Sequence, residues 1–117
     1  MHPRASKSGY FVDFPYCPGR LVASVGLDAA GKLVCWDTQM ASQSIIKGTM
    51  FEQYIKEGID GTQVEGLAEL PYAAPNVRVE WHVAPAGVPV LWWRSVGHSY
   101  SAFVKETLID DAARAWA

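Results

Sequence analysis

The sequence has little cysteine and no long apolar run. Its two cysteines, Cys17 and Cys35, are too few for a disulfide framework. No stretch approaches the roughly 20 apolar residues that span a bilayer, and the first residues lack the sustained apolar segment of a signal peptide. We therefore expect a cytoplasmic protein without a membrane partner.

Neither positive nor negative charge is in large excess. Ten Lys and Arg residues stand against twelve Asp and Glu residues, which gives a formal net charge of -2 at pH 7. Binding to a phosphate backbone requires a clustered excess of positive charge. The charge balance therefore argues against nucleic acid as a partner.

The motifs of common catalytic and metal sites are missing as well. There is no CxxC and no close pair of histidines, so no metal site is expected. Neither a GxGxxG loop nor a GxSxG elbow occurs. The adjacency of Ser95, His98 and Ser99 leaves a hydrolase as an alternative, although neighbours in sequence rarely have the geometry of a catalytic triad.

The chain is rich in apolar residues. Half of its residues are hydrophobic and five are tryptophan, which predicts a folded core. Residues 1–19 are punctuated by proline and glycine and predict an irregular arm with one short extended piece near residues 10–12. Residues 20–117 predict a single α+β domain.

Four stretches predict strands. Residues 21–27 and 32–39 flank an Asp-Ala-Ala-Gly turn at 28–31 and predict a hairpin; its strands are apolar on both faces, which suggests cover on both sides. Residues 76–83 alternate between apolar and polar, and residues 90–93 predict a fourth strand. We expect a mostly antiparallel sheet of about four strands.

Three stretches predict helices. Residues 101–116 predict one long C-terminal helix, because they carry a broad apolar face. That face is formed by Val104, Leu108, Ile109, Ala112, Ala113 and Trp116. The Thr-x-x-Glu patterns at residues 49–52 and 62–65 are capping boxes, which predict one or two short helices. Three carboxylates in this region are interpreted as capping or solvated: Asp60, Glu65 and Glu69.

One turn has features of a ligand site. Residues 94–99 follow the apolar stretch 90–93 and precede the long helix. Gly97 would allow close backbone approach, helix-start amides favour anions, and Arg94 adds a fork of donors for an oxyanion or phosphate. The alternative is a plain strand-to-helix corner with Arg94 in a surface ion pair.

Three stretches of the sequence resemble a known protein family. Residues 87–113 read GVPVLWWRSVGHSYSAFVKETLIDDAA, and they follow RLVASVGLDAAGKLVCWD at 20–37 and LPYAAPNVRVE at 70–80. Over residues 20–113 the chain resembles the molybdopterin-binding large subunit of the xanthine dehydrogenase/aldehyde oxidase family, of the isoquinoline 1-oxidoreductase type. Residues 1–19 and the end of the last helix do not share this resemblance.

The resemblance implies a molybdenum–pterin cofactor and the hydroxylation of N-heterocycles or aldehydes, with electrons passed to iron–sulfur centres. It implies that Trp93, Arg94, Ser95, Val96 and Gly97 lie against this cofactor, chiefly through their main chain. The family's catalytic glutamate, in a Gly-Val-Gly-Glu-like turn, has no counterpart here, and family subunits are much longer. The isolated chain is therefore expected to hold no cofactor and to catalyse no hydroxylation.

Five tryptophans cannot all be interior in a domain of this size. Exposed apolar surface usually marks a partner site, which predicts a homo-oligomer, a dimer joined through sheet edges or the tryptophan face. Two functions remain open. The chain is either a segment of a molybdenum hydroxylase large subunit that needs other segments or subunits, or a small oligomeric ligand-binding or interaction domain with no redox role.

Overall fold

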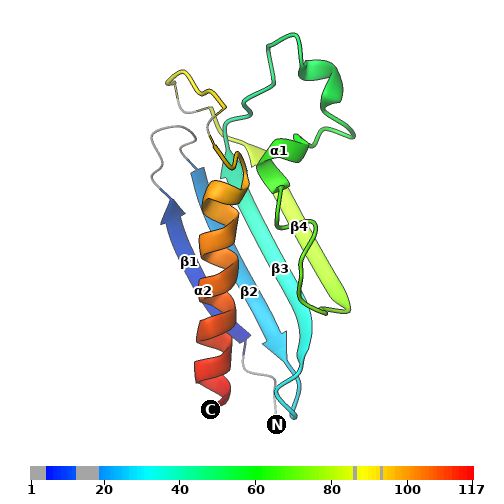
Figure 1. Ribbon diagram of the computed structural model, residues 1–117, viewed down its shortest axis with the longest axis vertical. Helices are drawn as coiled ribbons and strands as arrows, with labels where there is room; N and C mark the ends of the chain where they lie inside the picture. Colours follow the sequence, from blue (N-terminus) through cyan, green and yellow to red (C-terminus); the bar gives the residue numbers. More distant parts are fainter. Residues whose placement is uncertain (1–4, 13–18, 86, 93) are drawn as a thin grey trace.

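The chain folds as an α+β domain, which confirms the predicted class. A computed structural model describes residues 5–12, 19–85, 87–92 and 94–117, with residues 5–12 described by their backbone. Its elements in chain order are strands β1 (Ala5–Val12), β2 (Gly19–Leu27) and β3 (Leu33–Ser42), the 3-10 helix η1 (Glu52–Tyr54), helix α1 (Gly61–Val64), strand β4 (Asn76–Val83) and helix α2 (His98–Trp116). One long helix lies along one face of the sheet (Figure 1).

The sheet is mixed, so the predicted mostly antiparallel sheet of about four strands is confirmed only in part. The strand order is β1-β2-β3-β4; the first two pairs are antiparallel, and β4 runs parallel to β3. A parallel pair requires a crossover connection of a dozen or more residues. Residues 43–75 provide that connection, because they return the chain to the end of the sheet at which β3 began.

The predicted hairpin is present. Strands β2 and β3 pair in register with Ala23 opposite Thr38. In the turn, Asp28 Oδ1 accepts hydrogen bonds from the backbone N–H groups of Ala30 and Lys32, both at 2.9 Å. Gly31 takes a φ of 79°, which an L side chain rarely adopts. The Asp–Gly pattern therefore sets the turn as its chemistry predicts.

The structure differs from the predicted strands at two places, residues 90–93 and the N-terminal segment. Residues 90–92 have no regular structure, and Trp93 lies outside the described residues. Their apolar run reads as a strand, but Pro89 cannot donate to a ladder and the run lacks alternation. The fourth strand of the sheet is instead β1, which lies at one edge. It is longer than the extended piece expected near residues 10–12.

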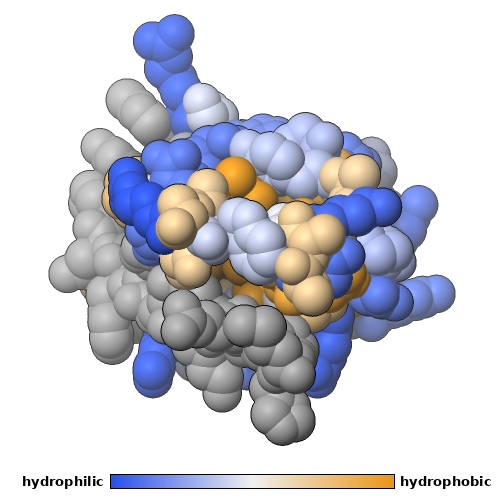
Figure 2. All heavy atoms as spheres, turned by 90° about the horizontal axis from the view of Figure 1, so that it is seen from below, coloured by the Kyte–Doolittle hydropathy of each residue, from blue (hydrophilic) through white to orange (hydrophobic). Residues whose placement is uncertain are grey.

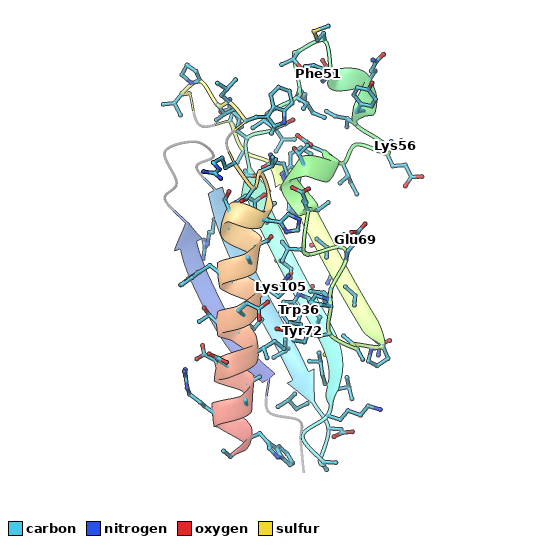
Figure 3. All side chains as sticks on the ribbon, in the orientation of Figure 1. Trp36, Phe51, Lys56, Glu69, Tyr72 and Lys105 are labelled. Carbon is cyan, nitrogen blue, oxygen red and sulfur yellow. The ribbon has the colours of Figure 1, made fainter. Side chains whose placement is uncertain are left out.

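Helix α2 forms most of the core with one face of the sheet. Val104 and Leu108 on the helix are fully buried and belong to one cluster with Leu21, Ala23 and Trp36 of the sheet. Figure 3 shows Trp36 over the sheet, beside the helix. Seen from the end that carries the C-terminus, hydrophobic residues lie among hydrophilic ones (Figure 2).

The opposite face of the sheet carries no helix among the described residues, so cover on both sides is not observed (Figure 1). Its positions on β3 and β4 include Asp37, Gln39, Arg78, Glu80 and His82. These side chains are polar and at least partly exposed. The sheet is therefore one-sided, with a polar outer face on β3 and β4.

The tryptophans are divided between interior and surface. Trp36 is buried and Trp81 is partly buried, whereas Trp92 and Trp116 are exposed. The ring of Trp116 nevertheless lies against Gly31, where an added Cβ would come within 2.6 Å of it. The end of α2 is thus held against the β2–β3 turn.

Candidate functional site

The turn that resembles a cofactor wall is a strained corner. We call residues 94–97 the corner. Ser95 and Val96 have positive φ values of 67° and 42°, and positive φ at a β-branched residue is a genuine outlier. Gly97, by contrast, has an ordinary helical φ of -62°. The sequence analysis expected close backbone approach at Gly97; the backbone strain falls on the two residues before it.

Gly97 is required for space. A Cβ at this position would come within 2.3 Å of the backbone oxygen of Thr62, which is shorter than any real contact of that kind. The start of α2 therefore packs directly on the backbone of α1. This close approach fixes where the corner can lie.

The side chain of Glu65 lies at the N-terminus of α2. Its Oε2 accepts a hydrogen bond from the N–H of Gly97 at 3.1 Å, and its Oε1 lies 3.7 Å from Nε2 of His98. Its backbone oxygen accepts a hydrogen bond from Ser101 Oγ at 2.8 Å. A carboxylate is stabilised at a helix N-terminus by the helix dipole. Glu65 thus takes the position that an external anion would need; the predicted capping box joined it to Thr62, whereas its side chain bonds to the start of α2.

The predicted cofactor-binding residues are only partly available. Trp93 lies outside the described residues, and Gly97 is buried with its amide bound to Glu65. The side chain of Arg94 is exposed, and no carboxylate of the described residues forms an ion pair with it. The predicted surface ion pair of Arg94 is therefore not found there. A guanidinium without an internal carboxylate partner can still receive an oxyanion from outside.

The hydrolase alternative has no support in the corner. Ser99 Oγ donates to the backbone oxygen of Arg94 at 3.0 Å, and His98 faces Glu65. Neither hydroxyl, of Ser95 or of Ser99, shares a hydrogen bond with His98 among the described residues. A serine nucleophile needs a base within hydrogen-bond reach, and this arrangement does not provide one.

A buried polar network holds α1 beneath the corner. Asp60 is fully buried; its Oδ1 accepts from Thr62 N at 2.9 Å and Thr62 Oγ1 at 2.6 Å, and its Oδ2 accepts from Ser44 Oγ at 2.5 Å. Asp60 therefore caps α1, whereas the sequence pattern assigned that role to Thr62. Gln63 continues the network, because its Oε1 accepts from Ser42 Oγ at 2.8 Å. Trp81 Nε1 donates to the same Ser42 oxygen at 2.9 Å.

Sequence reasoning missed this network as a unit. Its hydrogen bonds join residues 16, 21 and 39 positions apart. The Asp-Gly-Thr sequence at residues 60–62 was the available signal, since an Asp two residues before a donor amide is a common N-cap. The network connects the end of β3 with α1 and so with Glu65.

The first predicted capping box forms only in part. Thr49 Oγ1 accepts from Phe51 N at 3.1 Å, and Glu52 Oε2 accepts from Gly48 N at 3.0 Å. Only the single 3-10 turn η1 follows. Phe51 and Tyr54 are both exposed.

An exposed apolar surface lies beside the corner. We call residues 43–59 and 87–92 the loop end; in Figure 1 these green and yellow segments lie at the end of the sheet opposite the two termini. Phe51 stacks on Tyr54 at a centroid distance of 6.4 Å and meets Trp92 edge-on at 5.2 Å. Gln43 Nε2 donates to the backbone oxygen of Val88 at 3.3 Å, which joins the two loops. Figure 3 shows Phe51 far from the core residue Trp36.

Titratable groups with shifted pKa values lie away from the corner. The pKa of Tyr72 is raised above its usual 10.0, because its hydroxyl donates to Glu106, with smaller effects of burial and of the charges on Glu106 and Asp110. The pKa of Arg78 is raised by its hydrogen bond to Glu80, with smaller effects of the charges on Glu80 and Asp37. Each group is bound to a surface carboxylate, Tyr72 by a hydrogen bond to Glu106 and Arg78 by an ion pair with Glu80.

Metal-binding clusters and membrane-spanning helices are not found among the described residues. The described residues contain no group of three His, Cys, Asp or Glu side chains placed to hold a metal ion. Cys35 is an exposed free thiol on β3, and Cys17 lies outside the described residues. None of the helices in the described part of the chain combines the length and apolar character needed to cross a bilayer.

Comparison of the chain with models of protein families, with curated protein sequences and with solved structures gives no match. The family suggested by the three sequence stretches therefore stays a prediction.

Proposed function

We propose that the chain is a non-catalytic binding segment that docks through its loop end onto another protein. The observation that carries this proposal is the concentration of exposed apolar side chains there. Seven of the eleven large apolar residues exposed in the described structure lie in the loop end: Met50, Phe51, Tyr54, Ile59, Val88, Leu91 and Trp92. Met50 is 82% exposed and Leu91 is 68% exposed.

The size of this surface favours a protein partner. With about 150–250 Å² for a large side chain, the seven residues expose roughly 700 Å². The largest apolar patch on a typical monomer is about 300–600 Å², and a stable interface buries about 800 Å² on each partner. The exposed area summed over these seven residues therefore approaches the area that one partner contributes to an interface.

The partner we propose is the remainder of a molybdenum hydroxylase large subunit. This part of the proposal comes from the sequence resemblance, and it is supported by the position of the corner next to the loop end. Docking at the loop end would place another protein against Arg94, whose guanidinium would face an anionic group of the cofactor. Hydroxylation itself would depend on partner segments, because the carboxylate that the described residues place at the corner, that of Glu65, is already bound to the N–H of Gly97.

Co-purification tests this proposal. The tagged chain is co-expressed with an isoquinoline 1-oxidoreductase-type large subunit that lacks its own matching segment. We expect the two to co-purify and Trp92→Ala to weaken binding about 30-fold, since a central aromatic residue contributes about 2 kcal/mol or more. Phe103→Ala is the matched control, because Phe103 is equally aromatic and 62% exposed but lies on α2.

Two results would contradict the docking proposal. One is the absence of any complex, and the other is equal loss of binding in the Trp92 and Phe103 variants. Molybdenum and pterin analysis of the complex then decides whether the corner contributes to a cofactor site. Arg94→Ala should lower the cofactor content of the complex without lowering co-purification.

A second candidate function is an oligomeric interaction domain with no redox role. The capping of Gly97 by Glu65 favours it, because the amide that would bind an anion is already bound within the chain. Under this candidate the corner only joins the loop end to α2. It predicts that Arg94→Ala changes neither cofactor content nor any binding.

A further inference from the structure

Strand β4 forms an open edge of the sheet. It is the last strand in the order β1-β2-β3-β4 and lies at the margin of the sheet in Figure 1. Ala84, directly after β4, donates its N–H to the backbone oxygen of Ser42 on β3 at 2.9 Å. The peptide before it therefore turns the C=O of Val83 away from β3.

Alternation along the strand gives the direction of the other backbone groups. In an extended strand the N–H and C=O of one residue point to the same side, and those of the next residue point to the other side. The N–H and C=O groups of Val77, Val79 and Trp81 thus face outward. No backbone group of another described element bonds to them.

This edge has few of the features that protect edge strands. Proteins block free edges with proline, lysine or a β-bulge. The eight residues of β4 contain no proline or lysine, and their pairing with β3 has no register shift. Proline occurs only outside the strand, at Pro75 and Pro85. The edge can therefore accept another strand.

We propose that two copies of this chain pair through β4, antiparallel, about a twofold axis at Val79. In this register Val79 lies opposite Val79 of the second copy, and Val77 lies opposite the second Trp81. The outward-facing residues on both strands would exchange about six hydrogen bonds. The two sheets would become one continuous sheet with its helices on the same face.

Charge decides between the possible registers. On the polar face, an axis at Val79 places Arg78 opposite Glu80 of the second copy, twice by symmetry. An axis at Val77 or at Trp81 leaves Arg78 without an acidic residue opposite it. Opposite charges directly across an antiparallel pair stabilise it, and like charges destabilise it. The axis at Val79 is thus favoured among the registers with outward-facing hydrogen-bonding groups.

The side chains that this pairing would bring together are at least partly exposed. Arg78 is 60% exposed; it bonds Glu80 within the chain, and its Nη1 lies 3.9 Å from Asp37 Oδ2. Val77, on the helix side of the sheet, is 45% exposed. Pairing would cover Val77 with the second copy. The edge is distinct from the loop end, so this pairing and the docking of the loop end can fail independently.

Charge reversal tests the register. Arg78→Glu alone and Glu80→Arg alone place like charges across the axis, and we expect each to raise the dimer dissociation constant by about tenfold or more in sedimentation equilibrium. The double variant Arg78→Glu/Glu80→Arg restores opposite charges and should restore the wild-type constant. A monomeric wild-type chain at micromolar concentration, or no rescue by the double variant, overturns the proposal.

Disulfide formation gives a second, independent test. Hydrogen-bonded pairs in antiparallel strands have Cα atoms about 5.5 Å apart, within the range that a disulfide spans. In a Cys17→Ser/Cys35→Ser background, Val79→Cys should therefore oxidise to a covalent dimer. Val83→Cys is the control, because two copies of residue 83 would lie far apart in this register. Equal cross-linking of both variants, or none at Val79→Cys with the circular dichroism unchanged, overturns the register.

Discussion

Replacement of Asp60 by alanine should destabilise the fold by about 3 kcal/mol, because this fully buried carboxylate accepts three hydrogen bonds. Loss of the N-cap bond to Thr62 N costs about 1 kcal/mol. The bonds from the hydroxyls of Ser44 and Thr62 go to a charged group, and each such bond contributes about 1.5–3 kcal/mol. Release of the carboxylate from burial offsets part of that loss.

A loss of this size is measurable against a typical domain stability of about 5–15 kcal/mol. In urea unfolding followed by tryptophan fluorescence, a slope of about 1–3 kcal/mol/M converts it to a midpoint lower by about 1–3 M. Asp60→Asn is the matched control, because asparagine is an equally good N-cap. We expect the asparagine variant to lose about half as much stability.

Two outcomes would refute the reasoning about Asp60. A loss below about 1 kcal/mol in Asp60→Ala would mean that the network contributes no more than an ordinary surface cap. A larger loss in Asp60→Asn than in Asp60→Ala would mean that shape and capping matter less than the polar group left behind. Either result would remove the network as the anchor of α1 beneath the corner.

Two further predictions concern the start and the middle of α2. Gly97→Ala should destabilise the domain by at least about 2 kcal/mol in urea unfolding, since its Cβ would collide with a backbone oxygen of α1. Gly61→Ala is the control: its Cβ would meet nothing within 4 Å, so the change should be neutral or stabilising by up to about 1 kcal/mol. Equal effects of the two substitutions would contradict the steric argument. The pKa of Tyr72 is raised, first by its hydrogen bond to Glu106, so the folded state favours the protonated phenol. The stability that this hydrogen bond contributes is present below the unfolded pKa of 10.0. It is lost as the pH rises through the higher pKa of the folded state. Stability between pH 9 and pH 11 should therefore fall more steeply in the wild type than in Tyr72→Phe, and parallel curves would contradict this assignment.

The elements with clear periodicity could be predicted from the sequence. The hairpin around Asp28, the alternating strand β4 and the long helix α2 all have local signals, and each is found. The direction of β4 could not be predicted, because it depends on the path of residues 43–75 rather than on β4 itself. The stretch 90–93 was assigned to a strand because a short apolar run has no period to distinguish it from a loop.

The candidate site was less predictable than the fold. The corner was located from Arg94 and its neighbours, but its strain at Ser95 and Val96 has no sequence signature, since neither residue type favours positive φ. The bond between Glu65 and Gly97 joins residues 32 positions apart. Sequence reasoning over short windows does not detect contacts of this range, and they determine what the corner can bind.

The parallel pairing of β3 with β4 also bears on how the chain folds. The β2–β3 hairpin closes over the five residues 28–32, whereas β4 can join only after residues 43–75 have been brought together at a larger loss of chain entropy. We therefore expect β4 to be added late. Until then the edge of β3 carrying Cys35 stays open during synthesis, and this interval is when the chain is most exposed to aggregation.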